Sequence, residues 1–231
     1  RTVAADNAGD IHAAVQHLVE HGHRRIAFIA GSPDDMDGDT GARLRAFQAA
    51  LLSFGLPADV RLIAYGRHIY AGGQVAMQQV LETGASFTAL LASNDESALG
   101  AMQTLRTAGR RTPEDVAVIG FDDRLESAVQ TPPLTSVHLP LFQVGVEAVE
   151  RLLAQIRGDT SLPDLFEVRT RLVLRASCGC VPGATKRATV HDATVHDAMP
   201  IAAPDAQETL AQAMSTRLRA TSRLSSSPAR R

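Results

Sequence analysis

The sequence predicts an α/β fold in which helices flank a parallel sheet. Short apolar runs alternate with stretches in which apolar residues recur at helical spacing, and a glycine marks most of the turns between them. The run from Val116 to Ile119 stops in Gly120-Phe121-Asp122-Asp123. A buried parallel strand is continuously apolar, and its carboxyl end is where open sheets bind ligands. We therefore expect Asp122 to face a crevice, and the regular alternation argues against a β-sandwich or a helical bundle.

Each element has its own local signal. Apolar residues from Ile11 to Val19 recur on one side of a helix that Gly22 closes. Further along the chain, short apolar runs predict strands, and stretches with apolar residues on one helical face predict helices. The closing segment 166–174 is expected to form one strand or a pair of strands. The expected strands are 26–30, 62–65, 88–92, 116–119 and 136–138, and the further expected helices are 43–54, 73–83, 96–108 and 142–156.

Composition sets broad limits on function. The chain has 231 residues, of which 45% are hydrophobic and 21% charged, which is ordinary for a globular protein. The sequence contains neither an apolar run of the roughly 20 residues that cross a bilayer nor a signal-peptide pattern at its start, so a cytoplasmic protein without membrane contact is expected. Residues 1–180 carry 16 basic against 21 acidic side chains, which gives no basic stripe for nucleic acid.

The cysteines and a group of histidines raise the question of a metal. Cys178 and Cys180 are too close together to join distant parts of a fold, and a zinc site would need a second pair of cysteines. Two reduced thiols are expected, with redox sensing as the alternative. His17 and His21 share one helix face, but no thiol or carboxylate near them in the sequence completes a site. No metal site is therefore predicted.

Residues 181–231 differ from the rest of the chain. They are rich in Ala, Thr, Ser, Pro and Arg, and the segment Ala-Thr-Val-His-Asp occurs at 188–192 and again at 193–197. Only 206–219 has a helical pattern. We expect a low-complexity linker or disordered tail.

A set of short motifs, in this order and at this spacing, resembles the effector-binding core of the LacI/GalR type of bacterial transcriptional regulator, which includes the lactose and ribose repressors. The resemblance covers roughly Val3 to Arg175. It implies the type I periplasmic-binding-protein-like fold shared with periplasmic sugar-binding proteins. The motifs are His21–Ile29, Asn94-Asp95, Pro113–Val116, Gly120–Asp123, Pro132–Thr135 and Arg171–Arg175.

The same resemblance implies a domain organisation. Residues 1–180 would form an effector-binding or sugar-binding domain, with 6–138 as a nearly complete second lobe, 139–168 as a remnant of a mostly missing first lobe, and 169–180 as a closing strand. The helix that carries Phe142, Val146, Val149 and Leu153 would then lack the sheet that covers its apolar face. DNA would be bound only through a missing N-terminal domain, and a homodimer is expected.

Four ligand-binding residues are carried over from the family motifs. Arg43 lies in Arg43-Leu44-Arg45-Ala46-Phe47, and its guanidinium offers several fixed donors, whereas Arg45 is expected on the surface. Asp122 would accept hydrogen bonds from the ligand, and Asn94 would face the cleft or only cap the next helix. His68 takes the place of the family's stacking aromatic residue. Asp123 is expected to accept backbone N–H groups in its turn, and the carboxylates between Asp34 and Asp39 to form a solvated loop.

The leading hypothesis is a domain that senses a sugar or a purine-like metabolite and controls DNA binding through lobe closure. Alternatives are a sensor fused to a kinase or cyclase, a truncated and non-functional fragment, and an enzyme with a flavodoxin-like sheet. The enzyme is the least favoured, because the sequence shows neither a Gly-x-Ser-x-Gly nucleophile motif nor a phosphate-binding glycine loop. No cofactor and no catalytic residue are predicted.

Overall fold

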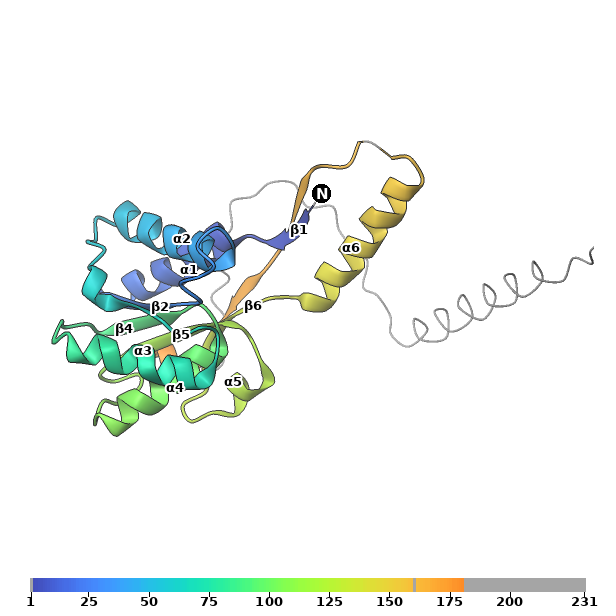
Figure 1. Cartoon of the computed structure of the whole chain (residues 1–231). Coiled ribbons are helices and arrows are strands. Elements are labelled where there is room, and N and C mark those ends of the chain that lie inside the picture. The colour runs from blue at the N-terminus through green and yellow to red at the C-terminus, as the bar shows by residue number, and fades with distance from the viewer. Residues whose placement is uncertain (1, 160, 181–231) are drawn as a thin grey trace, which may run out of the picture. The chain divides into compact units, whose positions relative to one another are not determined.

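In a computed structural model of the chain, residues 2–159 and 161–180 are described, and the predicted tail lies outside them. Six strands form one sheet in the order β3-β2-β4-β5-β6-β8 (Figure 1). The first five run parallel, as predicted, whereas β8 is antiparallel to β6. The bounds are β2 Ile26–Ala30, β3 Ile63–Tyr65, β4 Ala89–Ala92, β5 Ala117–Asp122, β6 Thr135–His138 and β8 Arg171–Val173.

Two pairs of helices cover the two faces of this sheet (Figure 1). Because side chains alternate along a strand, Phe28 of β2 joins the apolar cluster of α1 and α2, and its neighbour Ile29 joins that of α3 and α4. Every residue of β2 and β4 is buried, so both strands are continuously apolar. The helices are α1 Asn7–Glu20, α2 Asp39–Ser53, α3 Tyr70–Glu82 and α4 Asp95–Thr107.

A second, two-stranded sheet consists of β1 Thr2–Ala5 and β7 Leu165–Val168, which pair in parallel. Helix α6, Leu141–Ile156, contacts β1, and the guanidinium carbon of Arg151 lies 3.5 Å from the centre of the Phe166 ring of β7. None of the residues of α6 is buried, and Phe142 is 85% exposed. The apolar face of this helix is therefore only partly covered, by β1 and β7, among the described residues. No described helix has both the length and the apolar character that crossing a bilayer requires.

The closing segment 166–174 forms a pair of strands, one of the two expected forms, and the two strands, β7 and β8, belong to different sheets. The structure differs from the predictions in two places. The strand Thr2–Ala5 and the short helix α5, Leu125–Val129, were not predicted, because four or five residues are too few to show a period. The antiparallel direction of β8 was also missed, since apolar periodicity carries no information about the direction in which a strand runs.

Candidate functional site

The four predicted ligand-binding residues gather at the carboxyl edge of the large sheet. Asn94 follows β4 and Asp122 ends β5, while His68 lies in the turn after β3. Arg43 comes from α2, and its Nη1 donates to the backbone oxygen of Ser93 over 2.6 Å, which holds the guanidinium at the end of β4. The carboxyl ends of parallel strands meet at one edge, which accounts for the positions of Asn94 and Asp122, whereas Arg43 and His68 were assigned from the family motifs.

Arg43 is anchored by contacts on three sides. It is only 6% exposed, and its Nε donates to Asn7 Oδ1 over 2.8 Å. Its guanidinium carbon lies 3.9 Å from the centre of the Phe121 ring. Burial lowers the pKa of Arg43, and the nearby Asp122 carboxylate opposes this shift. The bonds to Asn7 and Ser93 use two of the five guanidinium N–H donors, so the side chain is fixed in place and still has donors to offer.

Asp122 is the acceptor that faces this donor. Burial raises the pKa of its carboxyl from 3.8 to about 6, an effect that Arg43 opposes and Asp95 reinforces. At neutral pH the group is ionised and incompletely compensated by the protein. Such a carboxylate gains from any ligand that donates hydrogen bonds to it.

Backbone strain is concentrated at this edge. Among the described residues, the non-glycine positions with positive φ are Arg67 at 54°, His68 at 59°, Asp122 at 109° and Asp123 at 56°. Residues held in this region cost free energy and tend to cluster where a structure binds a ligand. Two of the four are predicted site residues, and the other two are their neighbours in the chain.

The His68 ring is held against the end of β2. Its Nε2 lies 3.4 Å from Thr40 Oγ1, and a Cβ placed on Gly31 would lie 2.0 Å from the same nitrogen. Gly31 is therefore the residue that makes room for the ring. Burial, followed by the charge of Arg43, lowers the pKa of His68 below 6.5, so the ring is neutral at pH 7.

Asn94 uses both ends of its side-chain amide within the protein. Its Oδ1 accepts from the backbone N–H of Ser97 and caps α4 over 3.1 Å. Its Nδ2 donates to the backbone oxygen of His68 over 3.0 Å. Asn94 thus caps a helix and also ties down the strained turn that carries His68.

Asp95 has a larger role than the sequence suggested. From the sequence it was named only as part of a motif, but the side chain is fully buried and accepts from the Ser127 hydroxyl over 2.6 Å and the Ser136 hydroxyl over 2.6 Å. The backbone N–H of Arg124 adds a third bond of 2.8 Å. Asp95 therefore joins α4 to α5 and β6. A Cβ on Gly120 would lie 2.1 Å from Asp95 Oδ1, so this position of β5 requires glycine.

The prediction for Asp123 was wrong. Its carboxylate contacts side chains from distant segments: His138 Nδ1 at 2.9 Å and Arg175 Nη2 at 2.6 Å. The Arg175 guanidinium also donates to the backbone oxygen of Leu134 over 2.8 Å. Turn chemistry favoured local N–H partners, whereas tertiary structure brings a guanidinium from 52 residues away.

Two polar residues of the first turns of α1 also belong to this edge, and the sequence analysis did not single them out. Asn7 accepts from Arg43 and donates through Nδ2 to Asp39 Oδ1 over 3.1 Å, so this carboxylate at the start of α2 is hydrogen-bonded within the protein. Burial raises the pKa of Asp10 to about 6, and Thr170 donates a hydrogen bond to it. No usable signal for either residue was present in the sequence, because the strand β1 that places the start of α1 here was itself not predicted.

The structure also corrects the interpretation of the cysteines. Cys178 Sγ lies 3.3 Å from His17 Nε2, across 161 positions of the chain. The expectation that no thiol lies near the paired histidines was therefore wrong, because local sequence does not reveal a contact of such long range.

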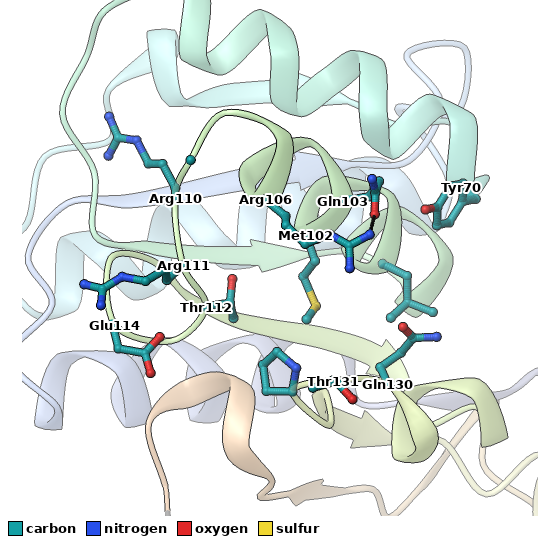
Figure 2. A pocket seen from close by; sticks show the side chains of 13 residues that line it. Tyr70, Met102, Gln103, Arg106, Arg110, Arg111, Thr112, Glu114, Gln130 and Thr131 are labelled. Atoms are coloured by element: carbon teal, nitrogen blue, oxygen red, sulfur yellow. Dashed lines mark hydrogen bonds between the residues drawn. The ribbon is translucent and has the colours of Figure 1, made fainter.

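A separate cavity of about 480 Å³ lies over the outer side of α4 (Figure 2). It is lined by residues of α4 that include Leu99 and Met102, by Tyr70 of α3, and by the loop around Gln130 and Thr131. None of the four predicted ligand-binding residues lines it. The polar edge and this cavity are two different surfaces of the domain.

Comparisons with known proteins agree with this arrangement of strands. The sequence profile of the periplasmic binding protein-like domain matches residues 15–178. The HTH-type transcriptional regulator CelR of Thermobifida fusca is 40% identical over 175 residues, which are 76% of this chain and 51% of that regulator. The chain belongs to the periplasmic binding protein-like domain family, in the branch found in LacI/GalR-type regulators.

Two solved structures are similar to the described fold. A complex of the transcriptional regulator CelR with cellobiose has a TM-score of 0.71 and 39% identity, over 76% of this chain and 53% of that one. The lac repressor dimer bound to operator and the anti-inducer ONPF has a TM-score of 0.72 and 28% identity, over 77% of this chain and 60% of that one. The chain spans about half the length of the curated relatives it matches.

Proposed function

We propose that the chain is the effector-binding domain of a LacI/GalR-type transcriptional regulator and that it binds a sugar at the edge formed by Arg43, His68, Asn94 and Asp122. One observation carries the proposal: an anchored guanidinium and a half-buried, ionised carboxylate face the same space at the carboxyl ends of the strands. The similarity to a regulator solved with cellobiose supports a sugar over a purine-like ligand.

The chemistry of a sugar suits these groups. A hydroxyl both donates and accepts, so neighbouring hydroxyls can donate to the two oxygens of Asp122 and accept from Arg43. The neutral ring of His68 offers a flat surface for the C–H face of a pyranose, although it is smaller than a Tyr or Trp ring. In this proposal Asn94 acts chiefly through its bond to the His68 backbone.

The output would be a change in DNA binding without covalent chemistry. A sugar that binds one arrangement of the protein more tightly than another shifts their populations by that difference in affinity. DNA contact belongs to the helix-turn-helix part of the complete regulator, which would act in the cytoplasm. The relatives are transcription regulators, which supports this output over a kinase or cyclase fusion and over a flavodoxin-like enzyme.

A homodimer is part of the proposal, because a similar structure is a repressor dimer. We place the contact between protomers at the cavity over α4, where Leu99 and Met102 are partly exposed. Analytical ultracentrifugation of the chain should show a dimer, and Leu99→Asp should give a monomer. A wild-type monomer at tens of micromolar would contradict the dimer.

Sugar binding is tested by isothermal titration of the 231-residue chain with cellobiose, glucose and galactose, and with guanine and adenine. We expect one sugar per chain and no nucleobase binding. Arg43→Ala should abolish the heat of binding, whereas Arg45→Ala, an exposed position of the same helix, should leave it unchanged. Nucleobase binding, or normal sugar binding by Arg43→Ala, would contradict the proposal.

A further inference from the structure

The last turn of α1 meets the segment that follows β8, and four side chains with metal-binding atoms converge there. His17 Nε2 lies 3.3 Å from Cys178 Sγ and 3.6 Å from Cys180 Sγ. His21 Nε2 lies 3.5 Å from Cys180 Sγ. The donor atoms of His17, Cys178 and Cys180 all lie within 4.8 Å of one another.

These separations match the edges of a tetrahedral zinc site. Zinc lies about 2.3 Å from a thiolate sulfur and about 2.0 Å from an imidazole nitrogen, so the sulfur and nitrogen of one site lie about 3.5 Å apart. The three sulfur–nitrogen distances, 3.3, 3.6 and 3.5 Å, bracket this value. His17, Cys178 and Cys180 therefore already stand at ligand separations, whereas His21 reaches the group through Cys180 and its ring has to move toward the other two ligands.

The protein orients His21 for such a bond. Its Nδ1 lies 2.8 Å from the backbone oxygen of His17, and because a carbonyl only accepts, Nδ1 carries the proton. Nε2 then presents its lone pair toward Cys180. Metal-binding histidines are commonly fixed in this way by a backbone carbonyl. The two histidines are one turn apart, with ring centroids at 4.2 Å, so both rings lie on one side of α1.

The sulfur of Cys178 is buried beside polar groups that fix its position. It lies 3.1 Å from the Thr135 hydroxyl and 3.4 Å from the backbone oxygen of Arg175. The Thr135 hydroxyl is shared, because it also lies 3.1 Å from the Arg175 oxygen as a donor and accepts from the backbone N–H of Arg175 over 2.8 Å. The thiol therefore has a carbonyl acceptor in the present state, and a cation that binds the sulfur displaces the thiol proton.

We propose that His17, His21, Cys178 and Cys180 form a structural Zn²⁺ site. Tetrahedral sites with two sulfur and two nitrogen ligands favour zinc. Binding displaces the two thiol protons, so a divalent cation, two thiolates and two neutral imidazoles sum to zero charge. Such a site is acceptable in a partly buried position and connects α1 to the residues after β8. It is separate from the Arg43–Asp122 edge and does not depend on the proposed sugar binding.

The experiment uses the full 231-residue chain, reduced and stripped of metal with a chelator. One equivalent of Co²⁺ should give thiolate-to-cobalt charge-transfer bands and intense tetrahedral d–d bands, and Zn²⁺ should replace it at one ion per chain by mass spectrometry. Zinc should also raise the melting temperature and protect both thiols from a thiol reagent. Absence of the cobalt bands, or two reactive thiols in the presence of zinc, would overturn the proposal.

Variants locate the ion. Cys180→Ser and His21→Gln lie at less buried positions than Cys178, so they are expected to fold and to lose the charge-transfer bands and the zinc-dependent rise in melting temperature. His12→Gln is the matched control, because His12 is on the same helix but contacts Ser53. Equimolar zinc retained by Cys180→Ser together with Cys178→Ser would place the ion elsewhere in the chain and overturn the proposal.

Discussion

The side-chain amide of Asn94 donates a hydrogen bond to the backbone oxygen of His68, so the residue that caps α4 also holds the strained turn after β3. Asn94→Asp separates the two roles, because Asp caps a helix as well as Asn does but cannot donate to a carbonyl. We expect α4 to stay intact by circular dichroism and the sugar affinity to fall by about tenfold, about 1.4 kcal/mol, the range of one lost hydrogen bond.

Asp6 supplies the control for this substitution. It caps α1 by accepting from the backbone N–H of Gly9 over 2.9 Å. Asp6→Asn preserves that cap and should change neither the affinity nor the urea midpoint. Unchanged affinity in Asn94→Asp would show that the bond to His68 does not matter for binding.

Asp122→Asn should stabilise the fold near neutral pH and abolish sugar binding. The folded-state pKa of Asp122 is raised from 3.8 to about 6, so the folded protein binds this proton more tightly than the unfolded chain does. The ionised carboxylate therefore destabilises the fold above pH 6, by up to about 3 kcal/mol for a shift of about two units. Asn tolerates the positive φ of this position, so the substitution adds no backbone strain. Urea unfolding at pH 7.5 measures the gain.

Asp123→Asn is the matched comparison, one residue further and also at positive φ. Here the carboxylate is bonded to Arg175 and His138, and the amide that replaces it would lose a charged acceptor. We expect a loss of about 1–3 kcal/mol. The two neighbouring substitutions should thus change stability in opposite directions, and changes of the same sign would refute the difference in environment.

The same pKa values predict how stability and binding depend on pH. Asp10 and Asp122 both have pKa values raised to about 6 in the folded protein. Their ionisation therefore lowers the free energy of unfolding most above pH 6, and this free energy should rise again as the pH falls toward 4. Sugar affinity should follow the opposite course, because protonation below pH 6 removes the acceptor. Titrations of sugar into Asp10→Asn protein from pH 5 to pH 8 measure the pH dependence of affinity that is due to Asp122. Affinity that is constant across this range would contradict Asp122 as an ionised ligand.

Arg43→Lys tests whether the fixed geometry of the guanidinium is needed. Lysine keeps the charge but cannot bond Asn7 and Ser93 while stacking on Phe121. We expect at least a tenfold loss of affinity. Arg45→Lys on the exposed side of α2 should have no effect on the same titration.

Two glycines should respond differently to an added methyl group. In Gly120→Ala the Cβ would collide with the Asp95 carboxylate, which three donors hold in place, so the fold should lose about 1–3 kcal/mol. In Gly31→Ala the Cβ would lie 2.0 Å from the His68 ring and 2.4 Å from the hydroxyl of the buried Thr40, so the sugar affinity should fall together with the stability. Thermal melting and titration of both variants distinguish the two effects.

The sequence was informative wherever the determinant was local. The apolar run Ile26–Ala30 is long enough to define a buried strand, and its bounds agree with the prediction. The polar residues after β4 and at the end of β5 could be placed at one edge because parallel strands share their carboxyl ends. The serine partners of Asp95 are 32 and 41 positions away, and the thiol beside His17 is 161 positions away. Periodicity within a window of residues cannot report such pairs.

Strands β7 and β8 follow each other in the chain but belong to different sheets, with only Arg169 and Thr170 between them. Three peptide units span at most about 10 Å, so Val168 and Arg171 stay within that distance in every conformation. This short connection limits how far the two sheets can separate at this point. A change in the angle between them would therefore move the far end of α6 much farther than the residues beside Arg169 and Thr170.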